Sequence, residues 1–144
     1  MKRREFIKKA FRLGALAGTA ALVSPYNRLI AAALPAENAP VLAAVKGGGP
    51  AVMFDKGIAA LGGMTKFVKK GQTVVVKPNI GWDTRPELAA NTNPELVGRI
   101  IKHCYDAGAK KVFVFDHTCD PWKDTYKNSG IEEAAKKAGA SVVA

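Results

Sequence analysis

Residues 73–79 read Thr-Val-Val-Val-Lys-Pro-Asn, and they predict a buried strand that ends at a polar edge. Three consecutive valines follow the Gly71-Gln72 turn, and such an apolar run is typical of a strand buried on both faces of a parallel sheet. Pro78 ends the strand because it has no N–H and a fixed φ. Lys77 and Asn79 are therefore predicted to lie at the carboxyl edge of the sheet, where open α/β sheets bind ligands.

The pattern on both sides of this strand alternates between strand and helix. Apolar runs and glycine stops predict further strands at 41–45, 112–115 and 141–144, and helices at 51–61, 93–107 and 131–138. This alternation is typical of a parallel sheet with right-handed crossovers, so we expect an α/β fold of Rossmann-like βαβαβ type. The last strand has no helix after it, and we therefore expect 41–144 to be a partial domain, incomplete at its C-terminus.

The net charge of +10 is concentrated at the start of the chain. Residues 1–33 hold seven basic side chains and one acidic one, whereas the remainder holds 15 basic and 11 acidic ones. The lysines of the remainder are scattered rather than arranged in a stripe. This distribution is that of an ordinary solvated surface, and it argues against a nucleic-acid partner.

The N-terminal segment Lys2-Arg3-Arg4-Glu5-Phe6-Ile7-Lys8 resembles the twin-arginine export signal. The apolar run at 13–23 is shorter than the ~20 residues of a membrane span, and three alanines at 31–33 suit a signal peptidase. We expect 1–33 to be a signal peptide and 34–40 a linker. The resemblance implies export to the periplasm or another extracytoplasmic space, with membrane contact only through the leader. An uncleaved amphipathic anchor is the alternative.

The two cysteines, Cys104 and Cys119, are predicted to be free thiols. Cys104 falls late on a predicted helix and Cys119 falls beyond the end of the next strand. A helix and the following strand run antiparallel in such folds, so the two residues are expected on the order of 20 Å apart, against the ~6 Å that a disulfide tolerates.

Polar residues follow both predicted central strands and begin the helix between them, so we expect them to meet at one edge of the sheet. Three interpretations are open. In the first, Lys77, Asn79, Asn91, Thr92 and Asn93 bind a small anionic ligand. In the second, Asp116, His117 and Cys119, with Asp120, supply carboxylate, imidazole and thiolate ligands that suit zinc or iron. In the third, Asn93 and Asp116 only cap their elements and His117 is a surface residue.

Several segments of the chain resemble the domain-of-unknown-function family 362. The resemblance is carried by 61–63, 67–71, 75–79, 91–97 and 108–112, together with Asp116, Trp122, Tyr126 and Gly130-Ile131. It implies a bacterial or archaeal domain, often exported by the twin-arginine route and often accompanied by ferredoxin-type iron–sulfur proteins. This chain lacks clustered cysteines, so an iron–sulfur cluster would belong to a partner or to a missing segment.

Two functions follow from these observations. The first is a redox- or metal-associated enzyme or accessory protein, in which Lys77 and Asn79 orient an anionic ligand and Asp116 and His117 supply acid–base or metal chemistry. Its candidate catalytic residues are Lys77, Asp116 and His117. The second is a non-catalytic binding or assembly module of an extracytoplasmic complex. The cofactor stays open between none, a transition metal and an iron–sulfur cluster held elsewhere.

Overall fold

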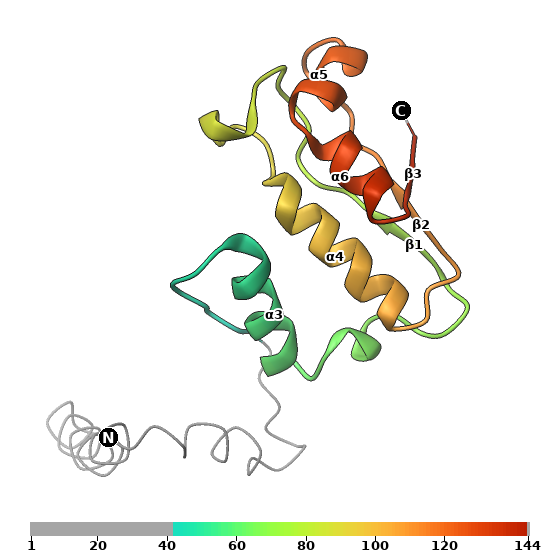
Figure 1. The fold of residues 1–144 in the computed structure, drawn as a ribbon. Coiled ribbons are helices and arrows are strands. Elements are labelled where there is room, and N and C mark those ends of the chain that lie inside the picture. Colours follow the sequence, from blue (N-terminus) through green and yellow to red (C-terminus); the bar gives the residue numbers. More distant parts are fainter. Residues whose placement is uncertain (1–41, 144) are drawn as a thin grey trace, which may run out of the picture. The chain divides into compact units, whose positions relative to one another are not determined.

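The computed structural model describes residues 42–143, which form a three-stranded parallel sheet and its helices (Figure 1). The strands are β1 (Thr73–Val76), β2 (Lys111–Val114) and β3 (Ser141–Val142), in the order β1-β2-β3. The α-helices are α3 (Pro50–Ala60), α4 (Pro94–Asp106), α5 (Trp122–Asn128) and α6 (Ile131–Lys137), and two short 3₁₀ helices, η3 and η4, span Met64–Lys66 and Pro86–Leu88. The predicted α/β class with a parallel sheet is confirmed.

The connections alternate as the sequence predicted. Helix α4 joins β1 to β2, and α5 with α6 joins β2 to β3. Asn93 caps α4 by accepting hydrogen bonds from the N–H groups of Glu95 and Leu96, and Pro94 occupies the first helical position. Helix α5 was not predicted, because its seven residues are mostly polar and too few to show an apolar period.

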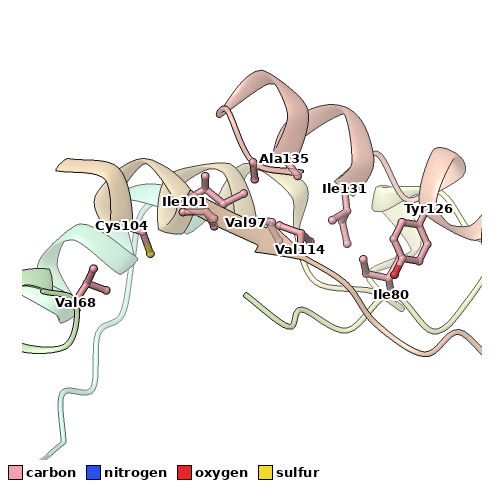
Figure 2. Close-up of a cluster of buried hydrophobic side chains, with 11 residues drawn as sticks. Val68, Ile80, Val97, Ile101, Cys104, Val114, Tyr126, Ile131 and Ala135 are labelled. Carbon is pink, nitrogen blue, oxygen red and sulfur yellow. The ribbon is translucent and has the colours of Figure 1, made fainter. Parts of the chain in front are cut away.

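The core lies between the sheet and the helices α4 and α6 (Figure 2). Alternate strand residues point into it, and Val112 and Val114 of β2 are fully buried. Helix α4 contributes Val97, Ile101 and Cys104, and the second crossover contributes Tyr126, Ile131 and Ala135. Burial of each of the aliphatic residues stabilises the fold by about 1.5–3 kcal/mol.

Two predictions about the strands are wrong. Of the strand predicted at 41–45, residues 42–45 have no strand conformation, and Leu42 is 81% exposed. Two alanines, which have low strand propensity, occupy the middle of that run. Strand β1 is not buried on both faces either, because it is an edge strand whose Val75 is 56% exposed.

The predicted leader and linker at 1–40 lie outside the described residues. Within the part of the chain that the structure describes, no helix is long and apolar enough to cross a membrane.

Candidate functional site

The parallel register of β1 and β2 brings Lys77 and Asp116 together. Val76 pairs with Val114, and the N–H of Phe115 continues the ladder to the carbonyl of Val76. Lys77 Nζ forms an ion pair with Asp116 Oδ1 just beyond the strand ends. The carboxylate is nearly buried, with 5% of its side chain exposed, whereas the lysine side chain is 60% exposed. The two polar ends therefore meet at one edge of the sheet, and the site presents the ammonium group to solvent.

Asp116 is held as a carboxylate by its neighbours. Its Oδ2 accepts a hydrogen bond of 2.7 Å from the N–H of Ile80, which is fully buried. Burial raises the pKa of Asp116, but the hydrogen bonds from Ile80 and Lys77 outweigh it and keep the pKa below its ordinary value of 3.8. An ionised Asp116 is a hydrogen-bond acceptor that positions the chain and the lysine.

Tyr126 of α5 fixes the backbone of Asp116, a role that the sequence reasoning missed. The Asp116 N–H donates to Tyr126 Oη at 2.7 Å, and the phenol donates in turn to the Asp116 carbonyl at 2.9 Å. The ring is buried and packs edge-to-face against Trp122 at a centroid distance of 6.2 Å. The signal in the sequence was the spacing of these two aromatic residues, which is one helical turn.

Asn79 and Thr92 tie the two ends of the long loop after β1 together. The N–H of Asn79 donates to Thr92 Oγ1 at 2.9 Å, and the N–H of Thr92 donates to the Asn79 carbonyl at the same distance. Asn79 Nδ2 also donates to the Ala90 carbonyl at 3.0 Å. The loop is thereby closed into a compact unit.

The side chains of Asn91 and Asn93 also form hydrogen bonds with backbone groups. Asn91 brackets Trp82, accepting from its N–H at 3.1 Å and donating to its carbonyl at 2.7 Å. Asn93 caps α4. All four amide and hydroxyl side chains proposed as ligand contacts thus stabilise the edge of the sheet, and their contact with a ligand stays a prediction.

The loop after β2 packs against the loop after β1 through further hydrogen bonds. The N–H of Cys119 donates to the Gly81 carbonyl at 2.8 Å, and the N–H of Asp83 donates to Asp120 Oδ2 at 2.8 Å. Asn128 Nδ2 of α5 then donates to Asp83 Oδ1 at 2.7 Å. These hydrogen bonds hold the loop after β1 against the loop after β2 and against α5.

A cavity of about 320 Å³ opens beside Asp116. It is lined by Phe115, Asp116, His117, Thr118 and Trp122. Phe115 and Trp122 are 41% and 50% exposed, so two aromatic rings face solvent there. The His117 side chain is exposed, and its Nδ1 lies 3.3 Å from the Thr118 carbonyl.

The residues proposed as metal ligands do not form a ligand set. Within residues 42–143, no three His, Cys, Asp or Glu side chains are grouped in a way that could hold a metal ion. The Asp116 carboxylate is engaged by Lys77 and Ile80, and Asp120 accepts from the backbone of the other loop. Both cysteines are free thiols as predicted, Cys104 buried and Cys119 exposed.

A second charged cluster, which the sequence did not indicate, joins α3 to α4. Arg99 donates two hydrogen bonds of 2.7 Å to the carboxylate of Asp55, and His103 Nε2 lies 2.8 Å from Asp55 Oδ1. The hydrogen bonds from Arg99 and then from His103 lower the pKa of Asp55 to about 2. Arg99 and His103 lie beyond the first turn of α4, and the bidentate geometry of the cluster is that of a structural clamp.

Comparison with known proteins gives one family and one curated relative. The family model described as "Domain of unknown function (DUF362)" matches residues 74–144. A thylakoid-associated protein of Synechocystis sp. is 42% identical over 50 residues, which are 35% of this chain and 16% of the relative. The chain thus spans much less than two thirds of that relative's length. No solved structure gives a significant match.

Proposed function

Since residues 74–144 of this chain belong to the family of domains of unknown function DUF362, we propose that they carry a binding site for a small anionic ligand at the carboxyl edge of the sheet. In this proposal Lys77 contacts the anionic group directly, and Asp116 positions the lysine. The cavity between Phe115 and Trp122 receives the remainder of the ligand.

The observation that carries the proposal is the exposure difference within the ion pair. The carboxylate of Asp116 is covered, so a molecule that approaches from solvent meets the ammonium group of Lys77 first. An ammonium group has three donors, and the pair uses one of them, so two remain for a carboxylate or phosphate. A cavity of about 320 Å³ is at the small end of the range for organic ligands.

The same geometry favours binding over catalysis at this edge. A general acid–base group needs a pKa near the operating pH, and Asp116 has the opposite shift. Its oxygens are engaged by Lys77 and by the Ile80 N–H. Of the three residues proposed as catalytic, Lys77 and Asp116 are engaged with each other, whereas His117 is exposed and lines the cavity. A redox or metal-associated role would therefore rest on a group supplied by a partner, such as an iron–sulfur protein.

The proposed location is outside the cytoplasm and rests on the leader. The test is a fusion of residues 1–40 to a reporter that is active only after export in the folded state. Replacing Arg3 and Arg4 together by lysine is expected to abolish export, and export that continues undiminished would contradict the twin-arginine assignment.

The ligand proposal is tested by titrating the full chain with inorganic phosphate and with small carboxylates while the unfolding free energy is measured. At an anion concentration about a hundred times Kd, stabilisation of about 2.7 kcal/mol is expected. Lys77→Met should remove this effect, whereas Lys127→Met, on the exposed side of α5, should keep it. Equal responses of the two variants would refute the site.

A further inference from the structure

Two aromatic side chains line the cavity beside Asp116, and neighbouring groups hold both of them in place. Trp122 packs edge-to-face against Tyr126, whose phenol is hydrogen-bonded to the N–H and the carbonyl of Asp116. Phe115 follows β2 directly, and its N–H donates to the Val76 carbonyl at 3.4 Å. Both side chains remain partly exposed. The cavity therefore has aromatic walls that a ligand does not need to order, which lowers the cost of binding.

The polar groups around this cavity favour a small organic ligand with negative charge. Of the residues that line it only Asp116 is acidic, and 5% of its side chain is exposed. His117 and Thr118 add an imidazole and a hydroxyl group to the wall. Lys123 adds positive charge beside Trp122, because its Nζ is 5.7 Å from the centre of that ring and has no carboxylate of residues 42–143 at ion-pair distance. Apolar walls with a few polar groups are typical of a site for a small molecule.

We propose that the anionic ligand of this site carries one planar aromatic ring, which stacks on Trp122 and contacts Phe115. This inference rests on the proposed anion site and names the chemical class of its ligand, an aromatic carboxylate or phosphate. Aromatic rings gain from stacked and edge-to-face contacts beyond the area that they bury, so a ring is preferred to an aliphatic group of similar size. A cavity of about 320 Å³ is near the lower limit for organic ligands, which favours a single ring over a dinucleotide.

The test compares small molecules that differ in one property at a time, with the full chain as the protein. Benzoate and cyclohexanecarboxylate have the same charge but differ in the ring, and phenyl phosphate and cyclohexyl phosphate repeat this comparison for the other acidic group. Benzamide keeps the aromatic ring without the charge. The increase in unfolding free energy with ligand concentration gives Kd. Within each pair the aromatic member is expected to bind about two- to tenfold more tightly.

Two replacements of Trp122 locate the ring contact. Trp122→Leu keeps an apolar side chain and should remove the preference for the aromatic member of each pair. Trp122→Phe keeps an aromatic surface for stacking and should retain most of that preference. Both replacements remove the indole from α5, so a difference between the two variants does not reflect a loss of the fold.

The two tryptophans of the chain, Trp82 and Trp122, provide a second readout. In Trp82→Leu the only tryptophan is Trp122, and benzoate should change its fluorescence saturably, with the Kd that unfolding gives. In Trp122→Leu the only tryptophan is Trp82, which is exposed and does not line the cavity. Its fluorescence should therefore show no saturable change.

Equal affinity within both pairs, or a preference for the aromatic member that survives in Trp122→Leu, would overturn the aromatic ligand. The anion site would still stand in that case if Lys77→Met abolishes binding of the carboxylates. Benzamide that binds as tightly as benzoate and depends on Trp122 would refute the anion site but support the ring contact. Absence of binding by all five compounds would overturn both proposals.

Discussion

Replacement of Asp116 tests the electrostatic design of the sheet edge most directly. Asp116→Ala removes the acceptor of the Ile80 N–H, which is fully buried and would be left without a partner. Such a buried unpaired donor costs about 1–3 kcal/mol. The ion pair with Lys77 adds at most about 1 kcal/mol, because the lysine is 60% exposed. The expected loss is therefore about 1–4 kcal/mol of the unfolding free energy.

Asp116→Asn is the matched control, because its Oδ1 still accepts from the Ile80 N–H. It loses the charge and the oxygen that faces Lys77, so a loss of about 1 kcal/mol is expected. Lys77→Met should cost less than about 1 kcal/mol, since it removes the exposed partner alone. Urea unfolding followed by circular dichroism gives the three values, provided that the slope with denaturant stays constant.

The refuting result is equality of the two Asp116 variants. If alanine and asparagine destabilise the protein by the same amount, the hydrogen bond to Ile80 does not support the edge of the sheet. A larger loss in Lys77→Met than in Asp116→Ala would equally contradict the assignment of the buried carboxylate as the organising group.

Three further predictions follow from contacts in the same structure. Tyr126→Phe leaves the Asp116 N–H without its acceptor and is expected to lower the unfolding free energy by about 1–3 kcal/mol in the same urea assay, and a neutral result would contradict the role of the phenol. The pKa of Asp116 in the folded protein lies below its ordinary 3.8, so its contribution to the unfolding free energy should be present above about pH 4 and lost as the pH falls through the folded pKa. The difference in unfolding free energy between wild type and Asp116→Asn should therefore narrow between about pH 6 and about pH 3. A constant difference would refute this. Asp55→Asn weakens the hydrogen bonds between Asp55 and Arg99 that hold α3 against α4. Because α3 has no buried residue, its amide hydrogen exchange is expected to become faster while α4 stays protected. Equal exchange rates in both helices would contradict a local clamp.

Local sequence chemistry was sufficient to predict the elements with strong signals. Asn93 and Pro94 mark the start of α4, and the valine and phenylalanine runs of β1 and β2 mark strands, because capping and apolar periodicity act within a few residues. The parallel direction of β1 and β2 was also predictable, because a connection that contains a helix is typical of two parallel strands. The meeting of Lys77 with Asp116 is a consequence of that order.

The roles of the residues at the edge could not be predicted from the sequence. The sequence Asn91-Thr92-Asn93 is equally compatible with contacts to a ligand and with hydrogen bonds to the backbone. Only the folded loop shows that these side chains form hydrogen bonds with backbone groups. The same holds for Tyr126, whose phenol reaches Asp116 only because α5 folds back over the strand end.

What the sequence determined by itself is the succession of strands and helices and the edge at which polar groups collect, because periodicity, capping and strand ends are local properties. Tertiary structure alone decided which carboxylate is buried, which amides serve as braces and which face of the sheet stays open. Burial and hydrogen-bond partners depend on segments 10 to 45 residues apart in the chain, such as Tyr126 with Asp116 and Asn128 with Asp83. No local pattern encodes them.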